Sequence, residues 1–230
     1  MELSNLEQIR KARLEKIREL GIDPYGSAIT DVERIDTLLE NFRLGEEIEK
    51  NPDSLFYSMS HKAQGRIVLR RDNGGLIWFK IRDDSTEIQV ALSKKAIPDP
   101  INFALAKLTD LGDIIAVEGP IRRSQTGEIT IWASKIHLSC KSLAHPPDKF
   151  LGLQDIEAKY RQRYIDMAFN EGFTHRLRVR SRIISLLRQE FEDRRFIEVE
   201  TPMLHPIAGG AAARPFSTHL NALDIPLFLR

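Results

Sequence analysis

The chain has 230 residues, of which 42% are hydrophobic and 29% charged, as in an ordinary globular protein of one or two domains. Its 34 basic and 33 acidic residues nearly cancel, so any site for a polyanion must come from local clustering. A single cysteine, Cys140, excludes an internal disulfide framework and indicates a reducing compartment. Because no apolar run reaches the length of a membrane span and no signal peptide is visible, we expect a cytoplasmic protein.

The first 20 residues predict an amphipathic helix, ended by a left-handed cap at Gly21 and by Pro24. Basic and acidic side chains are nearly balanced on its other faces, which favours solvated charge over phosphate contacts. A second, weaker helix is expected from Asp36 to Ile48. We interpret residues 1–60 as a helical extension. The apolar stripe of the first helix would comprise Leu3, Leu6, Ile9, Leu14, Ile17 and Leu20.

Residues 61–144 have the texture of a β domain. Alternating residues predict strands at 63–71, 76–83 and 87–92, and Asp72-Asn73-Gly74-Gly75 is a strong hairpin signal between the first two. A short helix at 100–108 and two further strands, at 113–122 and 128–138, follow. Three strands, a helix and two strands is the order of a five-stranded OB-fold β-barrel, whose exposed face commonly binds oligonucleotides.

One face of this barrel has side chains suited to an unpaired base. Trp78 and Phe79 are neighbours within a strand, so one points inward and the other outward, where an aromatic ring can stack a base. Gln89 offers a donor and an acceptor and Glu128 a carboxylate, which together suit a Watson–Crick edge. Taken singly, Trp78 has an alternative role as core filler, and Gln89 and Glu128 as exposed strand polars. Positive charge for the RNA backbone would come from Arg66, Arg70, Arg71, Lys80 and Arg82.

After the barrel, His145-Pro146-Pro147-Asp148 predicts a linker, and residues 155–169 predict a helix. Residues 175–195 predict a longer helix, whose seven arginines indicate either phosphate contacts or, more commonly, ion pairs. A strand at 196–200 and a turn at Pro202 should follow. The apolar stripe of the long helix would comprise Leu177, Ile184, Leu187 and Phe191.

The small-residue run Gly209-Gly210-Ala211-Ala212-Ala213 would let the backbone approach a ligand or another chain, or would serve as a flexible connector. His137 and Cys140 are close in sequence, but two candidate ligands without a second pair do not predict a structural zinc site. We find no nucleotide-binding or hydrolase motif, and no convincing nucleophile, general base or metal cage. The sequence therefore predicts neither a catalytic residue nor a metal site within the chain.

An ordered set of motifs resembles bacterial-type lysyl-tRNA synthetases, which are class II aminoacyl-tRNA synthetases. The most specific pieces are FIEVETPML at 196–204 and GGAAARPFSTHLNALD at 209–224. Aspartyl- and asparaginyl-tRNA synthetases share the plan of barrel and catalytic domain but lack the second piece. The other matching segments are LGIDPYG at 20–26, EIQV at 87–90, LGD at 111–113, VEG at 117–119, TGE at 126–128, KSL at 141–143 and PDKFLGLQDIEAKYRQRYIDM at 147–167.

The resemblance implies an α+β fold with four parts. These would be the helical extension, an OB-fold anticodon-binding domain at 61–144, a helical hinge at 145–172, and the start of an antiparallel class II catalytic domain at 173–230. Pro202 would be the signature proline of motif 1 at a homodimer interface, and Gly210 would lie in the lysine pocket.

By the same resemblance, Trp78, Gln89 and Glu128 would read uridines of the lysine anticodon. The chain departs from the family in having Trp78 where Phe is usual, and Asp84-Ser85-Thr86 where a glycine-containing turn is usual. Lysine–tRNA ligases activate lysine with ATP and Mg²⁺ and transfer it to tRNA, and the motifs that hold ATP are absent from these 230 residues. We therefore expect the chain to supply the anticodon-binding and dimerisation parts without activity of its own. The alternative is a non-catalytic module that binds tRNA or another single-stranded RNA.

Overall fold

The computed structural model describes residues 5–26, 29–49, 54–144, 146–147, 154–170, 172–209 and 214–229. It divides into two compact units, Met1–Ile165 and Asp166–Arg230. Helices and strands occur in both units, which agrees with the expected α+β class. The finer division into four parts, with boundaries at 60, 144 and 172, stays a prediction.

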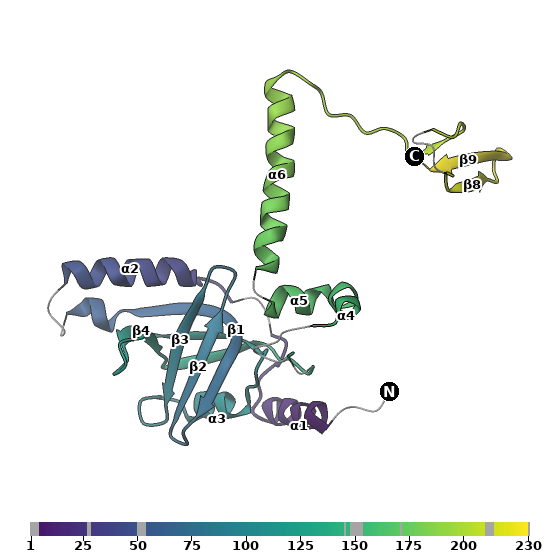
Figure 1. The fold of residues 1–230 in the computed structure, drawn as a ribbon. Helices are drawn as coiled ribbons and strands as arrows, with labels where there is room; N and C mark the ends of the chain where they lie inside the picture. The colour runs from purple at the N-terminus through teal and green to yellow at the C-terminus, as the bar shows by residue number, and fades with distance from the viewer. Residues whose placement is uncertain are drawn as a thin grey trace. The chain divides into compact units, whose positions relative to one another are not determined.

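A six-stranded sheet forms the centre of the first unit (Figure 1). Its strands run in the order β1-β2-β3-β5-β4-β6, and β1 also pairs with β4, so five of them form an OB-like ring. All neighbours are antiparallel except β3 and β5, which are parallel. The strands are β1 Ser60–Asp72, β2 Leu76–Arg82, β3 Glu87–Ser93, β4 Ile114–Arg123, β5 Ile129–Trp132 and β6 Lys135–Cys140.

The predicted hairpin and strand alternation are confirmed in β1 and β2. Asn73 N donates to Leu76 O at 3.0 Å, and Gly74 adopts φ 77°, the left-handed conformation that favours glycine at this turn. Along β2, buried and half-buried residues alternate strictly. Phe79 is 1% exposed and points into the core, so its neighbour Trp78 points outward.

The strand expected at 128–138 is instead two strands, β5 and β6, separated at Ala133-Ser134. The break allows the chain to change partners, because β5 pairs with β3 and β4 while β6 pairs with β4 alone. Ala133 N donates to Ala91 O, and Ser134 N to Glu118 O. A Cβ at Gly119 would lie 2.2 Å from Trp132 O, so this crossing requires a glycine.

Three α-helices and a short 3₁₀ helix cover the sheet of the first unit. Helix α3 lies at one end of the strands beside α1, and α2 lies at the opposite end (Figure 1). Helix α2 begins and ends within one residue of the expected helix and buries Ile35, Leu38 and Phe42 in the common core. The four elements are α1 Asn5–Glu19, α2 Ile35–Ile48, η1 Leu55–Ser58 and α3 Pro100–Leu108.

Helix α1 forms as predicted and ends at Glu19, with Gly21 at φ 75° just beyond it, but its predicted apolar stripe is only partly correct. Leu14 and Ile17 are buried, whereas Leu6 is 51% and Ile9 44% exposed. Arg10 is 5% exposed, although the charge pattern favoured solvated basic residues. The helix therefore docks through its C-terminal half and a buried guanidinium.

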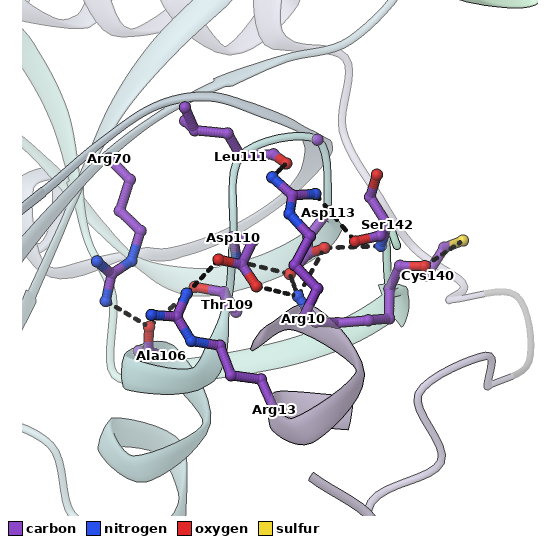
Figure 2. A network of polar contacts seen from close by, with 12 residues as sticks. Arg10, Arg13, Arg70, Ala106, Thr109, Asp110, Leu111, Asp113, Cys140 and Ser142 are labelled. Atoms are coloured by element: carbon purple, nitrogen blue, oxygen red, sulfur yellow. Dashed lines mark hydrogen bonds and ion pairs between the residues drawn. The ribbon is translucent and has the colours of Figure 1, made fainter. Parts of the chain in front are cut away.

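Arg10 belongs to a polar network that joins α1 to the sheet (Figure 2). Its guanidinium donates to Leu111 O, Ser142 O and Ala144 O at 2.9–3.0 Å. Arg13 forms an ion pair with Asp110, beside this cluster.

Lys141 is the centre of the same network. Its side chain is fully buried, with Nζ 2.6 Å from Asp110 Oδ2 and 2.8 Å from Asp113 Oδ2. Burial raises the pKa of Asp113, while the Lys141 ammonium and the N–H groups of Asp110 and Ser142 oppose this shift. The segment LGD begins at residue 111 and the segment KSL at residue 141. Although they are 30 residues apart in the chain, they meet in one ion cluster.

The single helix expected at 155–169 is two shorter helices, α4 Ile156–Arg161 and α5 Arg163–Phe169. The backbone leaves the helical conformation at Gln162, which has φ −116° and ψ 53°. The boundary between the two compact units falls within α5.

The second unit contains the long helix α6 Phe173–Asp193 and a three-stranded antiparallel sheet. The sheet has the order β7-β9-β8, with β7 Leu204–His205, β8 Ser217–Leu220 and β9 Ile225–Leu229. Residues 196–200 are not a strand, contrary to the prediction, because they have no strand partner among the described residues. The predicted apolar stripe of α6 is not buried in this chain: Ile184 is 41%, Leu187 55% and Phe191 55% exposed.

Candidate nucleic-acid interface

The outward face of strands β2, β3 and β5 brings the three predicted base-reading residues together. Strand registers pair Trp78 with Ala91, and Ala91 in turn with Trp132. The next row pairs Lys80 with Gln89, and Gln89 with Thr130. Paired residues present their side chains on the same face of a sheet, so Trp78 and Gln89 lie in adjacent rows of one surface.

Gln89 and Glu128 contact each other directly. Gln89 Nε2 donates to Glu128 Oε2 at 2.7 Å, and Thr130 Oγ1 donates to Gln89 Oε1 at 2.7 Å. Lys80 Nζ lies 3.2 Å from the other carboxylate oxygen of Glu128. The Glu128 carboxylate can only accept, so it requires the NH₂ group of Gln89, while the hydroxyl of the fully buried Thr130 donates to the amide oxygen. The amide of Gln89 therefore has one fixed orientation, with its NH₂ toward Glu128.

This orientation leaves hydrogen-bonding capacity that the contacts within the described residues do not use. One N–H of Gln89 is not used by Glu128, and each carboxylate oxygen of Glu128 has a further lone pair. The side chain of Glu128 is 41% exposed and that of Lys80 33%. The pair therefore presents a donor and an acceptor side by side on a surface that a base can reach.

Trp78 is flanked by a second tryptophan that the sequence analysis did not single out. The rings of Trp78 and Trp132 meet edge to face, with centroids 5.8 Å apart and planes at 69°. Its position could have been found from the sequence: Glu128, Thr130 and Trp132 alternate along a strand, and alternate strand residues share a face. Both indoles are half-buried, so their outer surfaces remain accessible.

The expected supply of positive charge is smaller than predicted, because most of the five basic side chains are engaged within the protein. Arg66 donates to Gly112 O, and burial lowers its pKa from the usual value. Arg70 pairs with Asp72, and Arg82 with Glu87. Lys80 pairs with Glu128, as described above.

Arg71 differs from the other four basic residues. It is exposed, lies opposite Trp78 in the register of β1 and β2, and forms no hydrogen bond or ion pair within the described ranges. Its guanidinium is thus available beside the indole of Trp78.

The turn between β2 and β3, at Asp84-Ser85-Thr86, contains no glycine and is closed by the side chain of Asp83. Asp83 Oδ1 accepts from Ser85 N at 2.7 Å and from Thr86 N at 3.0 Å, and its Oδ2 accepts from Ile35 N at 2.9 Å. Burial acts to raise the pKa of Asp83, but these hydrogen bonds outweigh it and the pKa is lowered. The carboxylate closes the turn leading into β3 and also binds the first turn of α2.

The other predicted positions are placed as follows. Gly210 lies outside the described residues, and Pro202 is exposed and outside any strand. His137 is exposed on β6, and the part of the chain that the structure describes contains no group of three or more His, Cys, Asp or Glu side chains able to hold a metal ion.

None of the helices in the described residues has both the length and the apolar character that a membrane-spanning helix requires.

Two family models match the two regions that the fold separates. Residues 62–139 match the OB-fold nucleic acid binding domain, and residues 155–230 match tRNA synthetases class II (D, K and N). The sheet with Trp78 and Gln89 is therefore OB-like and similar to nucleic-acid-binding OB-folds, and the C-terminal part of the chain is similar to class II tRNA synthetases.

The relatives that match along the whole chain are lysine–tRNA ligases. The chain is 40% identical over 229 residues to the lysine–tRNA ligase of Carboxydothermus hydrogenoformans, covering all of this chain and 44% of the relative. It is 42% identical over 231 residues to that of Staphylococcus epidermidis, covering 46% of the relative. The Staphylococcus aureus enzyme is also 42% identical, over 233 residues. The similarity is therefore to lysine–tRNA ligases in particular, and the chain spans about half the length of these relatives, consistent with their N-terminal portion.

Proposed function

We propose that this chain is the anticodon-binding and dimerisation part of a cytoplasmic lysine–tRNA ligase. One observation carries the proposal: Trp78, Gln89 and Glu128 lie together on the exposed face of the OB-like sheet, with the amide and carboxylate held in one arrangement. An indole beside a donor and an acceptor is the combination by which proteins stack an unpaired RNA base and read its edge.

The donor and acceptor of this pair can both be used by uridine. The edge of uracil presents its N3–H between two carbonyl oxygens, whereas cytosine presents an unprotonated N3 beside an amino group. The Glu128 carboxylate can accept from N3–H of uracil, and the free N–H of Gln89 can donate to a neighbouring carbonyl. A cytosine shifted along the pair would also form two hydrogen bonds, with N3 accepting from Gln89 and the amino group donating to Glu128, so the preference for uridine is proposed from the similarity to lysine–tRNA ligases. A lysine anticodon, which is rich in uridine, suits this site.

The first test is binding of the 230-residue chain to a stem-loop with a lysine anticodon. Trp78→Ala should weaken binding by about 1–3 kcal/mol, because it removes a stacking surface for one base. Tyr25→Ala is the matched control, since Tyr25 is an aromatic residue that is 47% exposed and lies outside this face. Equal affinities of wild type and Trp78→Ala would assign Trp78 to packing alone and contradict the proposal.

In this proposal the complete enzyme activates lysine with ATP and Mg²⁺ and transfers it to tRNA. The proposal assigns ATP and Mg²⁺ to the half of the relatives' length that this chain does not match. Lysine-dependent exchange between ATP and pyrophosphate measures activation directly. We expect no exchange with the 230-residue chain; exchange at an ordinary rate would contradict this assignment.

Dimerisation is supported by the surface of the second unit. Apolar side chains of α6 and of the segment after it are exposed, including Ile183 at 52%, Phe191 at 55% and Ile197 at 86%. Exposed apolar surface on this scale is typical of an interaction site. We propose that it pairs with the same surface of a second copy, with Pro202 in the contact.

The second candidate is a non-catalytic module that binds tRNA or another single-stranded RNA, and the nucleic-acid-binding OB-fold supports it directly. The two candidates predict the same stem-loop binding but differ in the coding sequence after Arg230. An in-frame continuation with further arginine-bearing motifs supports the ligase, and a stop codon there supports the module.

A further inference from the structure

Thr130 is fully buried, whereas Gln89 and Glu128, the two residues that its hydroxyl contacts, are half-buried. It lies in β5 between two strands, where it pairs with Gln89 of β3 and with Arg122 of β4. Its β-branched side chain has a restricted χ1 angle. The hydroxyl of Thr130 therefore has a fixed place, which is set by the backbone of three strands.

The hydroxyl of Thr130 donates to Gln89 rather than to Glu128. Its Oγ1 lies 2.7 Å from Gln89 Oε1 and 3.0 Å from Glu128 O, and a hydroxyl donates one hydrogen bond at a time. Glu128 O already accepts from Ser124 N at 2.8 Å. Gln89 Oε1 has no other donor among the described residues. Within this part of the chain, the buried hydroxyl is what holds the amide oxygen of Gln89.

The two contacts that hold the Gln89 amide differ in their access to water. Its Nε2 donates to Glu128, whose side chain is 41% exposed and also pairs with Lys80. Water competes for hydrogen bonds and ion pairs at exposed groups, so their net contribution is small. Thr130 is 0% exposed, so water does not reach its hydroxyl. In the proposed function a uracil also donates to Glu128, which leaves the Thr130 contact as the one that RNA binding does not change.

We propose that Thr130 is a positioning residue for base reading: its hydroxyl holds Gln89 by Oε1, so that Nε2 remains on the side of the base. This inference rests on the proposed function, since it gives Thr130 a part in the reading of one base by Gln89 and Glu128. Thr130 itself contacts no nucleotide, because its side chain is closed to solvent. Its effect on RNA binding passes through Gln89 alone.

The hydroxyl of Thr130, rather than its volume, is what this role requires. Valine has nearly the shape of threonine with a methyl group in place of the hydroxyl, so Thr130→Val removes the donor and keeps the packing. Gln89 Oε1 would then face an apolar group, and a polar atom left without its partner is costly. The Gln89 side chain is half-buried, so its oxygen would turn toward water and Nε2 would leave the base. Thr130→Ser keeps the donor.

The test uses the 230-residue chain and lysine-anticodon stem-loops in which one loop uridine at a time is replaced by a difluorobenzene nucleotide. This ring has the shape of uracil but no strong donor or acceptor, so it stacks without being read. The ratio of the affinities for uridine and for this ring, the edge ratio, therefore measures base reading apart from stacking. In wild type it should reach about 5- to 150-fold at one position, as for a two-bond contact to a base edge.

At that position, Thr130→Val should lower the edge ratio about 2- to 10-fold, the effect of one neutral hydrogen bond, and Gln89→Ala should lower it equally. Thr130→Ala, which also lacks the hydroxyl, should give the same result. Thr130→Ser should keep the wild-type ratio. Adding Thr130→Val to Gln89→Ala should change nothing further, because the two residues act as one unit.

Thr109→Val is the matched control, since Thr109 is also fully buried and its hydroxyl donates to Ala106 O at 2.8 Å, at the end of α3. This variant changes the stability of the chain in the same way, by removing a buried hydroxyl, but should leave the edge ratio at its wild-type value. A merely structural role of Thr130 would make the two valine variants alike in this ratio.

The outcomes distinguish this inference from the proposed function. A wild-type edge ratio in Thr130→Val would mean that Glu128 alone holds the amide, which overturns the inference and leaves the proposed function standing. Equal losses in Thr130→Ser and Thr130→Val, or a further loss when Thr130→Val is added to Gln89→Ala, would also overturn the inference alone. An edge ratio near one at every uridine in wild type overturns both.

Discussion

The two units of the chain bury their apolar residues to very different extents. Every buried hydrophobic side chain among the described residues lies between Leu14 and Leu138, in the first unit. In the second unit, comparable side chains are open to solvent, with Val199 71%, Ile207 78% and Phe216 81% exposed. The first unit thus has a core of its own and carries all three residues of the proposed base-reading face, whereas the second presents surface that suits a protein contact.

Because of this difference, mutations within the first unit should change its stability, while mutations on α6 should change self-association. Both tryptophans belong to the first unit, so tryptophan fluorescence reports on its unfolding alone.

The largest effect is expected from the buried ion cluster. Lys141→Ala leaves the carboxylates of Asp110 and Asp113 buried without their ammonium partner, and should destabilise the first unit by about 3–5 kcal/mol in urea unfolding. Lys16→Ala, an exposed lysine on α1, is the matched control and should stay within about 0.5 kcal/mol of wild type. A small effect of Lys141→Ala would mean that the first unit does not depend on this cluster.

A smaller loss should come from the strand crossing at Gly119. Gly119→Ala places a methyl group 2.2 Å from the backbone oxygen of Trp132, so the strands must shift, at a cost of about 1–3 kcal/mol. A Cβ at Gly75 would meet no atom within 4 Å, so Gly75→Ala is the control. If both variants unfold at the same urea concentration, the close approach of β4 and β5 is not a constraint on this fold.

The turn at Asp83 predicts a pH-dependent effect of about 1 kcal/mol. Asp83→Ala removes the acceptor of three backbone N–H groups, one of them at the start of α2. Since the folded-state pKa of Asp83 is lowered, its ionised form stabilises the fold at pH values above the ordinary carboxyl pKa of about 3.9. This contribution is lost as the pH falls through the lowered pKa.

The stability gap between wild type and Asp83→Ala should therefore be full at pH 7 and narrow below about pH 4. Urea unfolding at a series of pH values measures it. Asp83→Asn keeps an acceptor without the charge and serves as control, because its own contribution should not vary with pH. A gap that widens toward low pH would contradict the assignment.

The smallest effect on stability is expected on α6. Ile183→Ser and Leu187→Ser change side chains that are already 52% and 55% exposed, so unfolding of the first unit should shift by less than about 0.5 kcal/mol. Self-association, measured by sedimentation equilibrium, should weaken if this surface pairs with a second copy. Gln189→Ser on the same helix is the control. Unchanged self-association in both serine variants would remove this face from the proposed interface.

The sequence predicted local features more accurately than features that depend on distant partners. Asp72-Asn73-Gly74-Gly75 determines its turn by itself, and alternation alone placed Phe79 inside and Trp78 outside. The division of the expected strand at 128–138 depends on β5 pairing with two other strands, which no local pattern contains. Burial of Arg10 likewise depends on three carbonyl oxygens that lie at least 100 residues away.

The sequence predicted which three residues would share the candidate site, but not which neighbouring residues would hold and extend it. Trp78, Gln89 and Glu128 were expected on one face, and the registers place them there. Thr130, which orients the amide, and Trp132, which extends the aromatic surface, were not expected, although both alternate with Glu128. The positive charge available on this face was overestimated, because ion pairs such as Arg82–Glu87 form between neighbouring strands and are not visible in the composition of the chain.

In the proposed function, the Gln89–Glu128 pair beside Trp78 reads uridine. The most direct measurement compares the affinity of the chain for lysine-anticodon stem-loops that carry uridine or cytidine at the position that Trp78 stacks. Wild type should prefer uridine by about 1–3 kcal/mol, as for a two-bond contact to a base edge, and Glu128→Ala should lose that preference while still binding. Equal affinity of wild type for the two stem-loops would contradict the claim.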